Sequence, residues 1–194
     1  MINNHQNRLK DNYNMESCRQ LPDDVLDMLA QLKPSPRLIA HLTLVYDTVW
    51  NLTALMKESF PLLNFDRDVV LYGAAIHDIG KTVIPAELSE PGSLHEELGF
   101  QLLCKKGIDK KISLIARDHS NWNTNTQIET LLVSVADKIW KGKRVPELEE
   151  LLLKKILTDD GEDHWTVFIA LDEILEQLAS HAEGRLAYHA SCPL

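Results

Sequence analysis

The segment YGAAIHDIGK, residues 72–81, ends an apolar run with the adjacent pair His77 and Asp78. Both side chains can bind metal ions or transfer protons. A buried carboxylate is costly unless a cation or several hydrogen-bond donors lie nearby. At the end of a helix both side chains can face one cavity, and Asp78, with two oxygens, can bridge two ions. The pair is therefore a candidate site for metal chemistry.

Further polar side chains lie on apolar stripes with helical spacing. A single His on such a stripe is usually an interior histidine whose ring is hydrogen-bonded. Four imidazoles and two carboxylates converging from five segments would instead repel one another and lack solvation, unless a shared cation compensates them. We therefore interpret these six residues as metal ligands: His41, His77, Asp78, His95, His119 and Asp137.

The mixed ligand set indicates which kind of metal to expect. Imidazole suits zinc, iron, manganese and nickel, whereas carboxylates suit harder ions, so the combination favours a catalytic transition metal over calcium. We expect two divalent ions, Fe, Mn, Zn or Ni, with Mg as an alternative.

Apolar residues recur at three- and four-residue spacing along the 194-residue chain, and no segment shows sustained strand alternation. This pattern predicts an all-α fold: a compact multi-helix bundle with additional C-terminal helices. The expected helices cover about residues 24–32, 35–60, 66–78, 93–106, 109–119, 126–140 and 147–157, and a long helix follows the TDDGED turn.

Local signals mark several helix ends. Ser35 and Pro36 are typical of an N-cap and first helical position, and Ser93 with Glu96 has capping-box spacing. Gly80 and Gly107 are expected to end their helices. The long C-terminal helix is expected to place one apolar stripe on a single face: Trp165, Phe168, Leu171, Leu175 and Leu178.

Composition indicates a soluble globular protein, because 44% of residues are hydrophobic and 25% are charged. The net charge of -9 disfavours broad attraction to nucleic-acid phosphates. With no long apolar run and a polar amino terminus, we expect neither a membrane span nor a secretory signal, and a cytoplasmic location with reduced cysteines. We expect a loose tail over residues 1–20 and a single domain over 21–194.

The motif order resembles the HD-domain superfamily of metal-dependent phosphohydrolases over about residues 37–144, with C-terminal helices over 146–191. HDIGK and VADKIW both appear, and two histidines between them resemble the binuclear subclass. The resemblance implies that a hydroxide between two ions is the nucleophile and that Asp78 bridges them. It implies one ion held by His41, His77, Asp78 and Asp137, and another held by Asp78, His95 and His119.

The same resemblance suggests substrate contacts. Lys81 looks like the phosphate-contacting lysine of HDIGK, the alternative being a solvated loop lysine. Arg144, with Lys141 beside it, is similar to a basic residue in symmetric dinucleoside tetraphosphate hydrolases, although solubility at a helix end explains it equally well. Arg37 either faces the cavity or caps a helix, and Asn121 is a candidate pocket residue. No role is assigned to the remaining histidines: His5, His164, His181 and His189.

The leading functional hypothesis is hydrolysis of a phosphoester or phosphoanhydride in a small nucleotide-like substrate. A mixed-valent di-iron oxygenase of the same superfamily, acting on a polyol or phosphonate, is the alternative, and a non-catalytic sensing module is a third class. The single His in DHS argues against cyclic-dinucleotide phosphodiesterase activity. We expect a small phosphorylated partner, no nucleic acid, no membrane, and a long C-terminal helix that serves as a homodimer surface or a lid.

Overall fold

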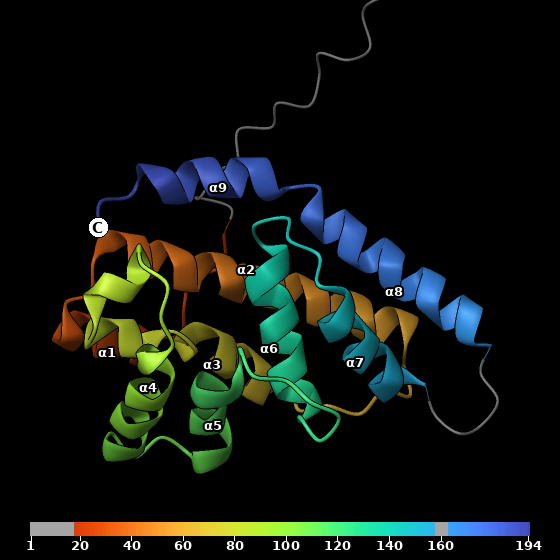
Figure 1. The fold of residues 1–194 in the computed structure, drawn as a ribbon, viewed down its shortest axis with the longest axis horizontal. Helices are drawn as coiled ribbons and strands as arrows, with labels where there is room; N and C mark the ends of the chain where they lie inside the picture. Colours follow the sequence, from red (N-terminus) through yellow and green to blue (C-terminus); the bar gives the residue numbers. More distant parts are fainter. Residues whose placement is uncertain (1–17, 158–162) are drawn as a thin grey trace, which may run out of the picture.

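The computed structural model describes residues 18–157 and 163–194, and throughout these ranges the regular elements are helices (Figure 1). The all-α prediction is confirmed. The predicted loose tail lies outside the described residues except for positions 18–20, and so does the TDDGED turn except for Asp163. The α-helices are α1 (Asp23–Leu32), α2 (Pro36–Ser59), α3 (Arg67–Ile76), α4 (Leu94–Lys105), α5 (Lys110–Asp118), α6 (Ile128–Ile139), α7 (Pro146–Ile156), α8 (His164–Ala179) and α9 (Ala182–Ser191).

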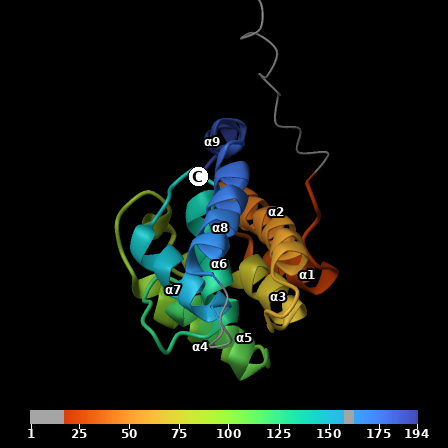
Figure 2. The same cartoon turned by 90° about the vertical axis from the view of Figure 1, so that its right-hand side faces the viewer.

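The long helix α2 is the centre of the packing and contacts α3, α6, α8 and α9. Its residues Leu38, Leu42 and Leu52 are fully buried. Helices α4 and α5 pack as a pair, and α5 packs against α3 and α6. In the side view α8 lies between α7 and α2 with α6 behind it (Figure 2). Within the described ranges, none of the helices has both the length and the apolar character needed to span a bilayer.

Two predicted helix ends are confirmed. Ser35 is the N-cap of α2, where its Oγ accepts a hydrogen bond from the backbone N–H of Leu38, and Pro36 is the first helical residue. Gly107 follows α4 with φ of 80°, a left-handed backbone that glycine adopts without steric cost. The N–H groups of Gly107 and Ile108 then bond back to the last turn of α4, which satisfies carbonyls at the helix end.

The predicted capping box at Ser93 is wrong. The Ser93 side chain makes no cap hydrogen bond. The carboxylate of Glu87 accepts the N–H groups of Leu94 and His95 instead, at 3.1 and 3.0 Å. Glu87 lies in the short 3-10 helix η3 (Pro85–Leu88), so the cap comes from the preceding loop. Its two oxygens satisfy two orphan donors at once, which a serine hydroxyl at the N-cap does not do.

Gly80 does not end α3 as predicted, because α3 ends at Ile76 and Gly80 lies in the 3-10 helix η2 (Ile79–Thr82). Its function is close packing against α4. A Cβ on Gly80 would lie 1.9 Å from the carbonyl oxygen of His95 and 2.7 Å from the amide nitrogen of Gly99. Gly80 and Gly99 therefore let the turn after α3 touch the start of α4.

The predicted apolar face of the C-terminal helix is correct only in part. Trp165 and Phe168 are 66% and 41% exposed. The buried stripe of α8 starts one residue earlier than Phe168 and follows a four-three-four spacing, which places Trp165 and Phe168 on its flank. The buried residues are Val167, Leu171, Ile174, Leu175 and Leu178.

We predict that Gly80→Ala lowers the free energy of unfolding by about 3 kcal/mol, because the added methyl group collides with backbone atoms of α4. Gly107→Ala is the matched control. Nothing lies within 4 Å of its added methyl group, so it costs only the left-handed backbone strain of about 1 kcal/mol. Urea unfolding of both variants checks this, and equal losses would contradict the packing role of Gly80.

Candidate metal centre

The six predicted ligands meet in the interior, at the ends and inner faces of five helices. His41 lies on α2, His77 and Asp78 follow α3, His95 begins α4, His119 follows α5 and Asp137 lies on α6. None of the six residues is more than 7% exposed. Polar side chains this deeply buried need partners.

The ends of α3 and α5 fix two of the imidazole rings. Helix C-termini leave carbonyl groups without intrahelical partners. The Nδ1 of His77 lies 2.9 Å from the carbonyl oxygen of Ala74, and the Nδ1 of His119 lies 3.0 Å from that of Ala116. Each Nδ1 therefore carries the proton and donates it. The Nε2 lone pairs face the cluster, which is the tautomer that metal-binding histidines use.

His95 is held in the same tautomer by a carboxylate. Its Nδ1 lies 2.5 Å from Oε2 of Glu87, and its Nε2 lies 3.1 Å from Oδ1 of Asp78. Burial alone would raise the pKa of Glu87, but hydrogen bonds from the ring and backbone of His95 hold it below its usual value. Glu87 is a site residue that the sequence did not reveal, because it precedes His95 by eight positions in an irregular loop.

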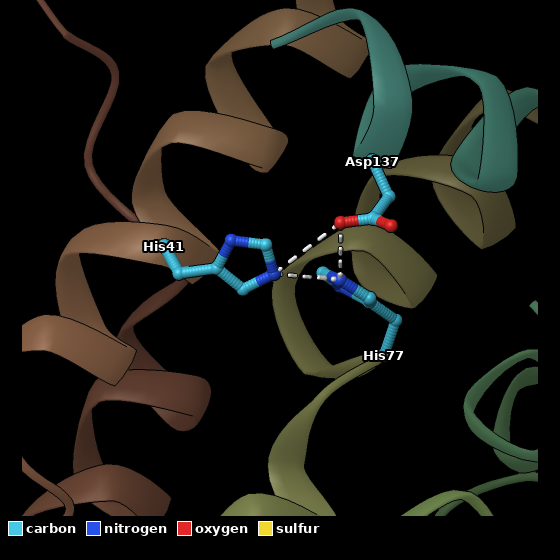
Figure 3. Close-up of side chains that lie close together, drawn as sticks. All are labelled: His41, His77 and Asp137. Carbon is cyan, nitrogen blue, oxygen red and sulfur yellow. Dashed lines mark hydrogen bonds and ion pairs between the residues drawn. The ribbon is translucent and has the colours of Figure 1, made fainter. Parts of the chain in front are cut away.

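One candidate ion position lies among His41, His77 and Asp137 (Figure 3). The Nε2 atoms of His41 and His77 are 3.2 Å apart, and Oδ1 of Asp137 lies 3.5 and 3.7 Å from them. The three side chains come from three different helices and point toward a common centre. Two nitrogens and one oxygen then converge on one point, as expected for a transition-metal site.

A second candidate position lies among His77, Asp78 and His119. Oδ2 of Asp78 lies 2.9 Å from Nε2 of His41, whereas its Oδ1 faces the Nε2 of His119 at 3.5 Å. The carboxylate of Asp78 thus lies next to a histidine of each candidate group, His41 of the first and His119 of the second, as the bridging role requires. Its Oδ1 is fully buried and has no hydrogen-bond partner among the described residues. An orphaned carboxylate oxygen among imidazole nitrogens fits a cation, so the residues present suit divalent metal.

Electrostatics leaves the two carboxylates and the His41 ring in a metal-binding protonation state. Burial would lower the pKa of His95, but hydrogen bonds to Asp78 and Glu87 raise it above its usual value. Burial would raise the pKa of Asp78 and Asp137, but the neighbouring histidines, and for Asp137 also Lys141, hold both well below their ordinary value. Burial lowers the pKa of His41 to about 4. At neutral pH the two carboxylates are therefore ionised and the His41 ring is neutral, which is the form that coordinates cations.

Lysines line the outer side of the two carboxylates. Nζ of Lys81 lies 2.5 Å from Oδ2 of Asp78, and Nζ of Lys138 lies 2.6 Å from Oδ2 of Asp137. Their side chains are 17% and 18% exposed, so this side of the cluster reaches solvent. Sequence reasoning missed Lys138, although it directly follows Asp137 in the motif.

Comparison with known proteins agrees with this geometry. The model of the HD domain family matches residues 47–140, which hold five of the six ligands; His41 lies just before the match. Residues 47–140 of this chain therefore form an HD domain. A tRNA (cytidine(56)-2'-O)-methyltransferase of Thermoplasma volcanium is 26% identical over 163 residues. The match covers 73% of this chain and 44% of that protein, so the chain spans less than half of the relative's length. No solved structure gives a significant match.

Arg144 lies at the edge of the HD segment, on the side of α7 and α8. Its guanidinium pairs with Glu149 at 2.8 Å and with Asp172 at 2.7 Å. These hydrogen bonds raise the pKa of Arg144, with Glu149 as the larger cause. Within the described structure, Arg144 makes no contact with the metal ligands that would support the expected substrate role. It joins α7 to α8 instead.

Arg37 and Asn121 also lie outside the HD ligand cluster. Nε of Arg37 donates to the carbonyl oxygen of Cys192 at 2.9 Å, and Nη2 donates to that of Ala190. Arg37 therefore caps the end of α9, the second of its two expected roles. Asn121 is exposed and lines a cavity of about 340 Å³ between α5 and α6.

His189 is a neighbour of the HD ligands that sequence reasoning left without a role. It lies on α9, and its ring centroid is 6.1 Å from that of His41 and 5.1 Å from that of Trp140. It follows the last ligand by more than 50 positions and lies beyond the HD segment. Neither spacing nor motif order could have connected it with the centre.

We predict that Mn²⁺ raises the melting temperature of the wild type, since a ligand that binds only the folded state stabilises it by about 2.7 kcal/mol at 100 times its Kd. His77→Ala removes a residue that belongs to both candidate groups and should abolish the shift. His164→Ala, an exposed histidine on α8, is the control and should keep it. A shift that survives in His77→Ala would contradict the assignment.

We also predict that Glu87→Gln weakens metal binding about 10- to 100-fold, as loss of a carboxylate that orients a metal-binding imidazole typically does. The amide keeps one acceptor oxygen in place of two, so it loses at least one of the three contacts that Glu87 makes to the His95 ring and to the N–H groups of Leu94 and His95. Competition with a coloured chelator measures the affinity. Glu90→Gln changes an exposed carboxylate in the same loop and should have no effect; equal affinities for the two variants would refute the role of Glu87.

Proposed function

We propose that this protein is a metal-dependent phosphohydrolase that cleaves a phosphoester or phosphoanhydride in a small nucleotide-like substrate. The observation that carries the proposal is the pair of lysines, Lys81 and Lys138, beside the two buried carboxylates. The chain as a whole has a net charge of -9, so this positive charge is local. A cationic edge next to a candidate metal centre suits an anionic substrate.

The two lysines can bind substrate once metal ions, rather than the ammonium groups, neutralise the carboxylates. Lys81 and Lys138 each neutralise one carboxylate through a single ammonium contact. When cations compensate Asp78 and Asp137, the ammonium groups are free to bind the oxygens of a phosphoryl group. Divalent ions bound in this centre supply Lewis acidity toward the phosphoryl group and toward water.

The remaining groups hold the geometry of the reaction. Three of the histidines keep fixed tautomers through Ala74, Ala116 and Glu87, so no ring has to reorient during turnover. In the overall reaction water forms a new P–O bond, the bond to the leaving oxygen breaks, and that oxygen takes a proton. Preorganised charge around the phosphoryl group is the main contribution that such a site makes.

The methyltransferase activity in the name of the Thermoplasma relative does not support this proposal. That protein is a tRNA methyltransferase, and this chain spans 44% of it. The proposed hydrolysis rests on the HD-domain residues themselves. A cytoplasmic location and the absence of nucleic-acid and membrane partners stay predictions from composition.

The experiment is a panel of nucleotides assayed for phosphate release after loading with Mn, Fe, Zn, Ni or Mg. We expect Lys81→Ala to lower kcat/KM about 10- to 100-fold, the effect of losing a charged hydrogen bond to substrate. Its metal content should not change. Lys143→Ala removes an exposed lysine and should match the wild type.

No phosphate release with any of these metals would refute the hydrolase assignment. Oxygen consumption by the iron-loaded protein on a polyol or phosphonate would assign the oxygenase class instead. An aerobic and an anaerobic assay in parallel distinguish the two reactions.

A further inference from the structure

The C-terminal helix α9 brings a fifth imidazole to the edge of the metal centre. His189 is half-buried and packs edge-on against Trp140, which packs edge-on against His41 in turn. In Figure 1, α9 lies along α2, the helix that carries His41. The hydrogen bonds from Arg37 to the carbonyl oxygens of Ala190 and Cys192 hold this end of α9 in place.

Positive charge gathers around this imidazole. Burial lowers the pKa of His189, and the charges of Arg37 and Lys141 lower it further. Nζ of Lys141 lies 5.7 Å from the ring centroid of Trp140, on the same aromatic side chain that His189 contacts. Lys141 at the end of α6 and His189 on α9 therefore lie against the same indole ring, and Arg37 on α2 bonds to carbonyl oxygens one and three residues after His189.

A second observation suggests that this region takes a ligand. Trp140 is 3% exposed, and its Nε1 is buried with no hydrogen-bond partner among the described residues. A buried N–H without an acceptor is costly.

We propose that Lys141 and His189, together called the α9 rim, bind a second phosphoryl group of the substrate next to the one that is cleaved. The inference rests on the proposed function and narrows its substrate class to molecules with two adjacent phosphoryl groups, such as nucleoside diphosphates. The 6.1 Å between the rings of His189 and His41 places the α9 rim directly beside the ligand cluster. Lys141 and His189 both lie after the matched HD segment, which ends at residue 140.

The test uses calorimetry with inorganic pyrophosphate and inorganic phosphate on the metal-loaded protein. We expect the wild type to bind pyrophosphate more tightly than phosphate. His189→Ala should lower the ratio of the two affinities about tenfold, the effect of one lost hydrogen bond to a charged group. His189→Gln, which keeps a hydrogen-bond donor, should restore most of the ratio. His164→Ala is the control and should keep the wild-type ratio.

Lys141→Ala and Lys143→Ala form a second matched pair, because both remove a lysine from the same loop. Only Lys141→Ala should lower the ratio. A structural role for His189 would lower thermal stability without changing the ratio of affinities, and this result would overturn the proposal. Equal binding of pyrophosphate and phosphate by the wild type would overturn it as well.

Nucleotide assays separate this inference from the proposed function. If the wild type hydrolyses nucleotides but His189→Ala lowers kcat/KM equally for diphosphates and monophosphates, the α9 rim is refuted and the hydrolase stands. If no nucleotide is hydrolysed but the binding ratio responds to His189→Ala, the α9 rim stands and the hydrolase is refuted.

Discussion

Two buried carboxylates among four buried imidazoles are the constraint on which this fold depends. Asp78 and Asp137 are ionised in the interior, and the surrounding rings of His77 and His119 present lone pairs rather than protons. Hydrogen bonding within the protein leaves Oδ1 of Asp78 without a donor. Such an arrangement is unfavourable in a medium of low polarity unless cations sit within it. The protein surrounds this centre with helix ends, where backbone carbonyls are available to orient the rings.

The surrounding elements can be understood as supports for these rings. The last turns of α3 and α5 orient His77 and His119 through their own carbonyl groups. Gly80 allows the turn that carries Asp78 to touch the start of α4, where His95 lies. Glu87 then serves two purposes with one carboxylate, because it caps α4 and orients the His95 ring. A change at any of these supports alters the centre without touching a ligand.

The sequence predicted the metal ligands better than the residues that orient them. His and Asp on apolar helical stripes are recognisable because burial of such residues demands compensation, and their order matched the HD motif. Glu87 and His189 act through contacts in space that no fixed spacing encodes, whereas Lys138 directly follows Asp137 in the motif and could have been identified from it. Ser93 and Gly80 carry the residue types of helix caps, but a carboxylate from the preceding loop and close backbone packing determine what these positions do. Local propensity therefore fails where tertiary contacts supply the partner.

Crystals of metal-loaded protein measured at the absorption edge of the metal test the central claim most directly. The account predicts one anomalous peak about 2.0–2.3 Å from the Nε2 atoms of His41 and His77 and from a carboxylate oxygen of Asp137, and a second peak at a similar distance from Asp78 and the Nε2 of His119. Crystals with no peak among these side chains, after soaking with each of Mn, Fe, Zn and Ni, would contradict it.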